Sequence, residues 1–291
     1  MRDVDPQHVV LFHHFRRFLE EAAREGIGVA PLKGAHLLTS VYPAGEDRGM
    51  LSDVDFLVRP GEFARAGALL SRMGFARAPW PKGRIATEEV FYEAGYTLDV
   101  DGGRHILFEL HRHLIQPARH PIDDAAMWRR SSPSTFEGAP CRRLAQDDHF
   151  LHAIVHLLTH QFVSPQRSLR DLELLLRSGQ VDLGTVARRA REWECARATW
   201  ICLGLLRARC PELVAPRTLD ELSPPLPSRR VARFLVPDEG GFRWSGLGDR
   251  AREAVLWPWL LDGPRPALRF GAHYLRLRCR DLAAAAAAFR K

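Results

Sequence analysis

The spacing of apolar residues changes partway along the chain, and this change constrains the fold more than any other feature. Over residues 25–115, short alternating runs typical of strands are interleaved with helical repeats. From residue 123 onward the repeat is helical, with helices expected at residues 147–161, 168–178, 183–193, 196–209, 229–235, 250–261 and 267–289. This order predicts an α+β domain at residues 1–130 and a helical domain at residues 141–291. The intervening segment, rich in small and turn-forming residues, is expected to join them.

One expected strand, over residues 51–58, carries acidic residues on the face opposite its apolar side chains. Its period of two places Val54, Phe56 and Val58 on one face. Asp53 and Asp55 therefore lie together on the other face. Two carboxylates about 7 Å apart on one face of a strand repel each other unless a cation lies between them. Mg²⁺ prefers oxygen ligands and commonly bridges to substrate phosphates. The pair therefore predicts a divalent-metal site for phosphate chemistry.

A second strand, expected over residues 104–114, repeats this arrangement. Glu109 and His111 lie on its polar face, and apolar residues flank Glu109 on the other. Glu109 is therefore predicted as the third carboxylate of a two-ion site, which would clamp the attacking and leaving oxygens of an in-line displacement. His111 is a candidate for acceptor binding or proton transfer.

A phosphate site is expected at the turn where the strand-like run over residues 29–34 leads into a helix over residues 35–42. Gly34 stands at this turn, and the backbone amides that open the helix there can bind an anion. Lys33 and Arg48 supply positive charge for the phosphates of a nucleotide. Ser52 completes the predicted nucleotide-binding residues, directly before the acidic strand.

These motifs follow one another in an order that resembles a known superfamily. They are Leu32-Lys33-Gly34-Ala35, Arg48, the run Ser52-Asp53-Val54-Asp55-Phe56-Leu57-Val58, Met73-Gly74-Phe75 and Phe108-Glu109-Leu110-His111. The set resembles nucleotidyltransferases of the polymerase-beta-like fold, and more narrowly the bacterial uncharacterised nucleotidyltransferase family. The resemblance covers residues 25–115, and more loosely extends to about residue 180. It implies a mixed sheet, an NTP substrate such as ATP, and Mg²⁺ or Mn²⁺ held by Asp53, Asp55 and Glu109.

Two positions depart from the superfamily pattern. Members have Gly-Ser at the turn, where the serine hydroxyl contacts the triphosphate, whereas this chain has Lys33-Gly34. A lysine ammonium can supply charge in place of that hydroxyl. The second strand motif continues into Arg112 where the family has tryptophan.

The resemblance implies attack on the α-phosphate of an NTP, with pyrophosphate leaving. We expect transfer of the nucleoside monophosphate (NMP) to a hydroxyl-type acceptor on a small molecule or peptide. His156 and Arg170, on expected helices of the C-terminal half, are candidates for contacting the acceptor. One alternative is a tRNA- or RNA-directed, toxin-like enzyme, since residues 265–291 hold seven Arg or Lys against one Asp. The other is a catalytically silent module that binds nucleotides.

Composition narrows the setting of this activity. The formal charge of +7 favours polyanionic partners such as nucleotides. Five cysteines without a C-x-x-C pair predict neither a disulfide framework nor a zinc ribbon and suit a reducing cytoplasm. No apolar run predicts a membrane span, so no membrane partner is expected, and the oligomeric state is left open. The motifs of P-loop enzymes and zinc proteases are absent.

Overall fold

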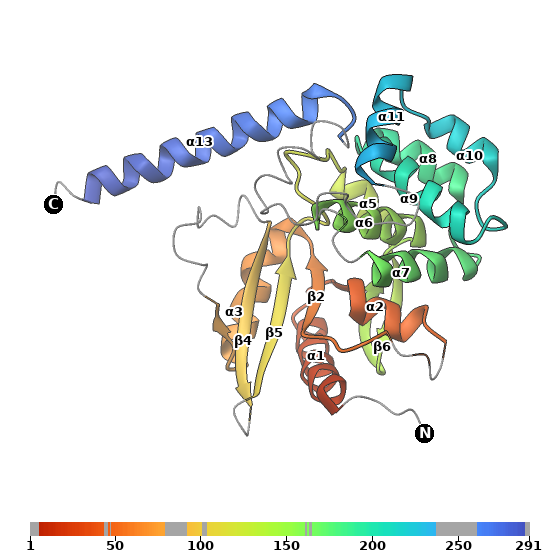
Figure 1. Cartoon of the computed structure of the whole chain (residues 1–291). Helices are drawn as coiled ribbons and strands as arrows, with labels where there is room; N and C mark the ends of the chain where they lie inside the picture. Colours follow the sequence, from red (N-terminus) through yellow and green to blue (C-terminus); the bar gives the residue numbers. More distant parts are fainter. Residues whose placement is uncertain are drawn as a thin grey trace. The chain divides into compact units, whose positions relative to one another are not determined.

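The chain divides into two compact units, unit 1 and unit 2. A computed structural model describes residues 6–43, 46, 48–78, 92–100, 104–160, 162, 165–236 and 261–288 (Figure 1). Unit 1 comprises Met1–Gln116 and Asp123–Ala145, and unit 2 comprises Pro117–Ile122 and Gln146–Lys291. The expected helix over residues 250–261 lies, apart from its last residue, outside the described residues.

Unit 1 is built around a five-stranded sheet. Its elements are α1 (Pro6–Arg24), β1 (Val29–Pro31), α2 (Lys33–Ser40), β2 (Asp53–Val58), η1 (Pro60–Glu62), α3 (Phe63–Arg72), β3 (Ala76–Arg77), β4 (Glu93–Val100), β5 (Arg104–His111), α5 (Asp124–Arg130), β6 (Ser132–Phe136) and β7 (Ala139–Arg143). The strand order is β1-β2-β5-β4-β3. The β2–β5 pair is parallel and the other neighbours are antiparallel. This mixed sheet confirms the α+β architecture expected from the sequence.

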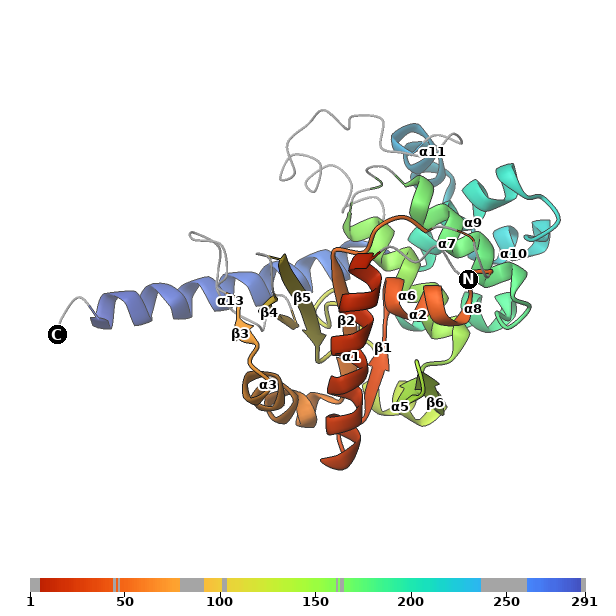
Figure 2. The same cartoon turned by 90° about the horizontal axis from the view of Figure 1, so that it is seen from below.

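Aromatic side chains seal one face of this sheet. Phe15 and Phe18 on α1 pack against Phe56 of β2, with ring centroids 5.3 and 4.9 Å apart, and against Phe108 of β5. All four rings are fully buried. Helices α1 and α3 lie along this face of the sheet (Figure 2). Because alternate residues of a strand point to opposite faces, the acidic residues of β2 and β5 project from the other face.

The segment expected to join the two domains is instead a hairpin of unit 1. Residues 132–143 form β6 and β7, which pair antiparallel across Glu137 and Gly138. Phe136 of this hairpin is buried, and its ring lies 5.0 Å from that of Phe15. The hairpin therefore adds to the core of unit 1, which extends to residue 145 rather than ending at residue 130.

Unit 2 is helical in its described part. Its helices are α6 (Gln146–Thr159), α7 (Gln166–Arg177), α8 (Leu183–Glu192), α9 (Ala196–Arg209), α10 (Pro216–Leu222), α11 (Leu226–Leu235) and α13 (Pro264–Ala288). The nearly buried guanidinium of Arg189 on α8 pairs with Asp148 at 3.0 Å and Asp147 at 3.3 Å, which ties α8 to α6. Helix α10 was not expected from the sequence. Within the described residues, no helix combines the length and apolar character needed to cross a bilayer.

A buried histidine should make unit 2 sensitive to acid. His120 faces the backbone oxygen of Trp193 through Nδ1 at 3.1 Å, and burial lowers its pKa to about 4. In the unfolded chain the imidazole has a pKa of about 6.5, so between pH 6.5 and 4 the unfolded state binds a proton that the folded state does not. We expect the free energy of unfolding to fall by about 2–3 kcal/mol as the pH drops from 7 to 4.5 on this account.

Urea unfolding at several pH values checks the effect of His120. The matched comparison is His120→Gln, which cannot titrate, beside His105→Gln at an exposed histidine of β5. His120→Gln should flatten the dependence of the unfolding free energy on pH more than His105→Gln, which removes a surface histidine beside Asp99. An unchanged slope in His120→Gln would contradict the assignment.

Candidate functional site

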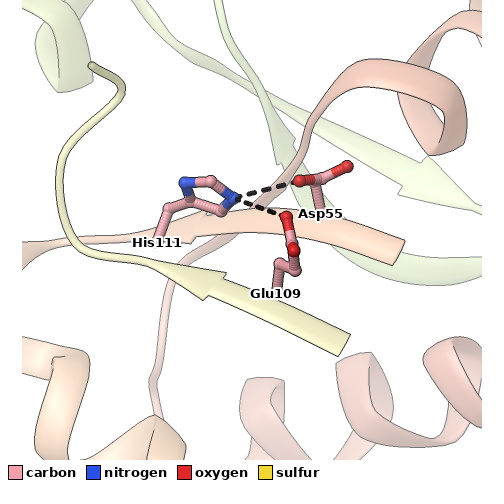
Figure 3. Close-up of side chains that lie close together, drawn as sticks. All are labelled: Asp55, Glu109 and His111. Carbon is pink, nitrogen blue, oxygen red and sulfur yellow. Dashed lines mark hydrogen bonds and ion pairs between the residues drawn. The ribbon is translucent and has the colours of Figure 1, made fainter. Parts of the chain in front are cut away.

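The polar face of the sheet brings three functional side chains together where β2 and β5 run side by side. The parallel register places Asp55 directly opposite Glu109, and His111 follows on the same face of β5. One ligand atom from each of the three side chains lies within 4.8 Å of the others (Figure 3). Asp55 and His111 are buried and Glu109 is partly exposed. This group, Asp55, Glu109 and His111, is called the carboxylate cluster below.

His111 fixes the orientation of Asp55. Its Nε2 lies 3.1 Å from Asp55 Oδ1, within hydrogen-bond distance, and 4.0 Å from Glu109 Oε2 (Figure 3). Its Nδ1 approaches Glu93 Oε2 of β4 at 3.3 Å, without hydrogen-bond geometry. His111 is therefore held between carboxylates on two sides.

The side-chain ammonium of Lys33 forms ion pairs with two carboxylates of the cluster. Its Nζ is 2.6 Å from Asp55 Oδ1 and 3.7 Å from Glu109 Oε2. The backbone of Lys33 has φ of 42°, in the left-handed region that a non-glycine residue adopts at a cost of about 1–3 kcal/mol. The ammonium thus neutralises the cluster, and the predicted contact of Lys33 with the phosphates of a nucleotide stays a prediction.

The charged groups of the cluster shift one another's pKa values. Burial acts to raise the pKa of Asp55, but the Lys33 ammonium and the His111 hydrogen bond outweigh it and hold that pKa well below its ordinary value. Burial, together with the negative charge of Asp55, raises the pKa of Glu109 well above its ordinary value. The cluster thus pairs one carboxylate that stays ionised with one that favours its protonated form.

Asp53 lies on the same face of β2 but outside the carboxylate cluster. Burial, and then the charge of Asp55, raise the pKa of Asp53, while the Lys33 charge and a hydrogen bond from Ser52 oppose them. Asp53 is half-buried and Ser52 is exposed. In the predicted metal triad, Asp55 and Glu109 therefore lie directly beside each other. Asp53 lies two residues before Asp55 on the same face of β2.

The turn at Gly34 is packed against Leu51 and against Arg48, which the sequence assigned to nucleotide binding. A Cβ at Gly34 would lie 2.3 Å from Leu51 Cδ2 and 2.9 Å from the Arg48 guanidinium. Helix α2 begins at Lys33, and no side chain caps its N-terminus. The first amides of a helix are suited to anions when no side chain satisfies them. Gly34 and Arg48 thus lie together beside an uncapped helix start.

Gly34→Ala should disturb this turn by overpacking. The added methyl group meets Leu51 at a distance that real side chains essentially never show, so we expect a loss of about 1–3 kcal/mol in the free energy of unfolding. The control is Gly61→Ala, because a Cβ at Gly61 meets no atom within 4 Å. Thermal melts of the two variants check this prediction, and equal stabilities would contradict it.

The remaining predicted residues lie elsewhere. His156 is on α6 and Arg170 on α7, both in unit 2. The ring of His156 contacts those of His152 and His160, at 6.3 and 4.2 Å between centroids. Arg170 forms an ion pair with Glu173 at 2.9 Å. Neither residue belongs to the carboxylate cluster, so their predicted contact with the acceptor stays a prediction.

Glu93 is a neighbour of the cluster that was not predicted. It lies opposite His111 in the antiparallel β4–β5 pair, and its charge adds to the field that raises the pKa of Lys33. The register could be predicted from the sequence, because Asp101-Gly102-Gly103 is typical of a hairpin turn. Counting outward from these residues along both strands pairs residue 93 with residue 111. That turn itself lies outside the described residues, but Val100 pairs with Arg104 on either side of it.

The donor atoms suit a divalent cation. Asp55 and Glu109 offer carboxylate oxygens, as Mg²⁺ and Mn²⁺ prefer, and His111 adds an imidazole nitrogen. Lys33 Nζ already occupies a cationic position between the two carboxylates. The residues therefore fit a metal ion whose positive charge would take over part of the role that the ammonium has here.

Nucleotidyl transfer uses carboxylates that hold a divalent cation beside a helix N-terminus that accepts phosphates. In this structure, Asp55 and Glu109 lie near the uncapped start of α2. The class of protein that combines them on a mixed sheet is the nucleotidyltransferases. The chain belongs to the uncharacterised nucleotidyltransferase family, whose model matches residues 2–211. This confirms the family that the motifs from Lys33 to His111 suggested.

Several solved structures show distant likeness. One is an antigenic nucleotidyltransferase-like protein from Paracoccidioides brasiliensis, with 16% identity, a TM-score of 0.47, and coverage of 72% of this chain and 92% of that one. The antibiotic-resistance factor ANT(2'')-Ia has 14% identity and a TM-score of 0.40, covering 65% and 94%. The Thermotoga maritima CCA-adding enzyme, complexed with tRNA, has 12% identity and a TM-score of 0.23, covering 94% and 83%. Among curated proteins, none matches the sequence significantly.

Proposed function

We propose that this nucleotidyltransferase transfers the NMP of an NTP to a hydroxyl group of a small molecule or peptide, and that it depends on Mg²⁺ or Mn²⁺. The observation that carries the proposal is the register of β2 and β5, which sets Asp55 opposite Glu109 with Asp53 on the same face. Carboxylates so placed hold metal ions, and these lower the barrier by neutralising charge on the phosphates.

The residues of the site would divide the work as follows. Asp53, Asp55 and Glu109 hold the metal, and His111 keeps Asp55 oriented through its hydrogen bond. The acceptor oxygen forms a bond to the α-phosphorus, and the bond from that phosphorus to the oxygen bridging to the β-phosphate breaks. Pyrophosphate leaves with the bonding electrons, and Glu109, which a bound metal would keep ionised, takes the proton of the acceptor hydroxyl.

The other end of the nucleotide would lie at the start of α2. The amides at Gly34 and Ala35 donate to phosphate oxygens, and the helix dipole adds to their attraction. Arg48, which lies against Gly34, supplies a guanidinium for the same phosphates. Ser52 positions Asp53 through its hydrogen bond. Lys33 would neutralise whichever anions are nearest, the carboxylates or the phosphates.

Calorimetric titration with each NTP, with and without Mg²⁺, tests this proposal. We expect at least one NTP to bind only in the presence of the metal, and the double variant Asp53→Asn/Asp55→Asn to lose that binding. The matched control is Asp99→Asn, an exposed aspartate on β4. Binding that is absent for every NTP, or that persists in the double variant, would overturn the proposal.

One observation favours a second candidate function, a module that binds nucleotides without turning them over. Lys33 already neutralises Asp55 and Glu109, so the cluster needs no metal ion to balance its charge. In that case NTP binding is retained when Mg²⁺ is removed, and no pyrophosphate is released under any condition. The titration and a pyrophosphate assay on the same sample separate the two functions.

A further inference from the structure

A cavity of about 490 Å³ opens between α9, α10 and α11 of unit 2. Sites for small organic ligands typically measure about 300–1,000 Å³, so the cavity is large enough for one. All of its lining residues fall between Trp200 and Val236, within a single stretch of described helices and turns. It shares no residue with the carboxylate cluster.

Three guanidinium groups line this cavity, and none of them is ion-paired among the described residues. Arg207 donates to the backbone oxygens of Val214 and Pro211, and Arg229 donates through Nε to that of Pro224. These contacts leave several N–H donors on both side chains. Among the described residues of the lining, Asp220 is the only acidic one, so these residues together carry a net positive charge.

The third guanidinium lies over an aromatic ring. The Arg233 Cζ is 5.4 Å from the ring centroid of Trp200, so the guanidinium makes a cation–π contact with this ring. Trp200 is almost fully buried, and Ile201 and Leu205 line the cavity beside it on α9. An apolar wall therefore adjoins the positive charge, which is the combination that holds a ring by packing and an anionic group by charge-assisted hydrogen bonds.

We propose that this cavity is a binding site for a phosphate monoester that carries a flat ring. Guanidinium groups match phosphate oxygens in bidentate geometry, and three of them against one carboxylate suit a doubly charged group better than a neutral one. Trp200 and its aliphatic neighbours take the ring. The site belongs to unit 2 alone and does not depend on the function proposed for the carboxylate cluster.

Phenyl phosphate is the probe that tests the proposal, in metal-free buffer of low ionic strength. The readout is the indole N–H resonance of Trp200, assigned by comparison with Trp200→Phe. We expect this resonance to shift saturably with phenyl phosphate, and at least tenfold weaker binding of phenol and of inorganic phosphate, each of which lacks one half of the recognised structure. Loss of one hydrogen bond to a charged group is sufficient for such a factor.

Substitutions on α11 test whether phenyl phosphate binds in this cavity. Arg229→Gln and Arg233→Gln should each weaken the binding of phenyl phosphate at least tenfold, and Arg233 is exposed, so its replacement should leave the fold intact. The matched control is Arg230→Gln, an exposed arginine of the same helix that does not line the cavity. The Asp53→Asn variant should bind phenyl phosphate with wild-type affinity, which would show that the probe does not bind at the proposed nucleotide site.

Three results would overturn the proposal. The first is a Trp200 resonance that does not shift saturably. The second is equal affinity for phenyl phosphate, phenol and inorganic phosphate. The third is a loss in Arg230→Gln as large as the loss in Arg233→Gln, which would reduce the effect to the overall charge of the helix.

Discussion

Replacing Asp55 with asparagine is expected to reduce NMP transfer by at least about 10²–10³-fold, the range seen when one group that stabilises transition-state charge is removed. Asparagine keeps the shape of the side chain but not its charge, so the metal and the Lys33 ammonium both lose their main anionic partner. The measurement is transfer of label from NTPs radiolabelled at the α-phosphate to pooled small-molecule and peptide acceptors, with pyrophosphate release as a second readout.

Two comparisons make this result specific. Asp99→Asn removes an aspartate from the same sheet whose side chain is 81% exposed, and it should retain wild-type activity. Thermal melts establish that Asp55→Asn is folded at the assay temperature. Wild-type activity in a folded Asp55→Asn variant would show that the chemistry, if any, takes place elsewhere.

The carboxylates of the site could be predicted from the sequence because strand alternation is a local property. Asp55 and Glu109 each alternate with apolar residues, which fixes the face that they share on their own strands. The contact between the two strands depends on sheet order, in which β5 lies between β2 and β4, and only the family resemblance pointed to it. The position of the Lys33 ammonium was harder still to predict from the sequence. It depends on a positive φ at the turn and on a charge partner on another element, Asp55 of β2.

The hairpin of β6 and β7 was missed for a physical reason. Its sequence contains Pro133 and Pro140, which are typical of loops, and small polar residues between them. Glu137 and Gly138 at its tip have φ of 47° and 83°, the two positive values of a tight hairpin turn that usually carries Asn-Gly or Asp-Gly. The energy that holds this hairpin comes from Phe136 in the core of unit 1, a tertiary contact that no local pattern reveals.

The second large effect is expected at Lys33. Lys33→Met keeps most of the length of the side chain but leaves the buried carboxyl of Asp55 without its cation, and breaking a buried ion pair typically costs about 3–5 kcal/mol. Since the Lys33 side chain is 21% exposed, we expect a loss of about 3 kcal/mol in the free energy of unfolding without metal. A divalent cation should bind the vacated carboxylates more tightly than in the wild type and recover much of this loss. Urea unfolding in metal-free buffer and in Mg²⁺ measures both effects.

The control for Lys33→Met is a cation in an exposed pair. Arg16→Met breaks a contact of 3.7 Å with Glu20 on the surface of α1, which should cost less than about 1 kcal/mol and respond to Mg²⁺ no differently from the wild type. If Lys33→Met costs no more than Arg16→Met, the ammonium does not hold the carboxylates together in solution. If it costs more but Mg²⁺ recovers none of the loss, the carboxylates serve as a structural ion pair. Recovery by Mg²⁺ in Lys33→Met alone would mean that a lysine and a metal ion compete for the same two carboxylates.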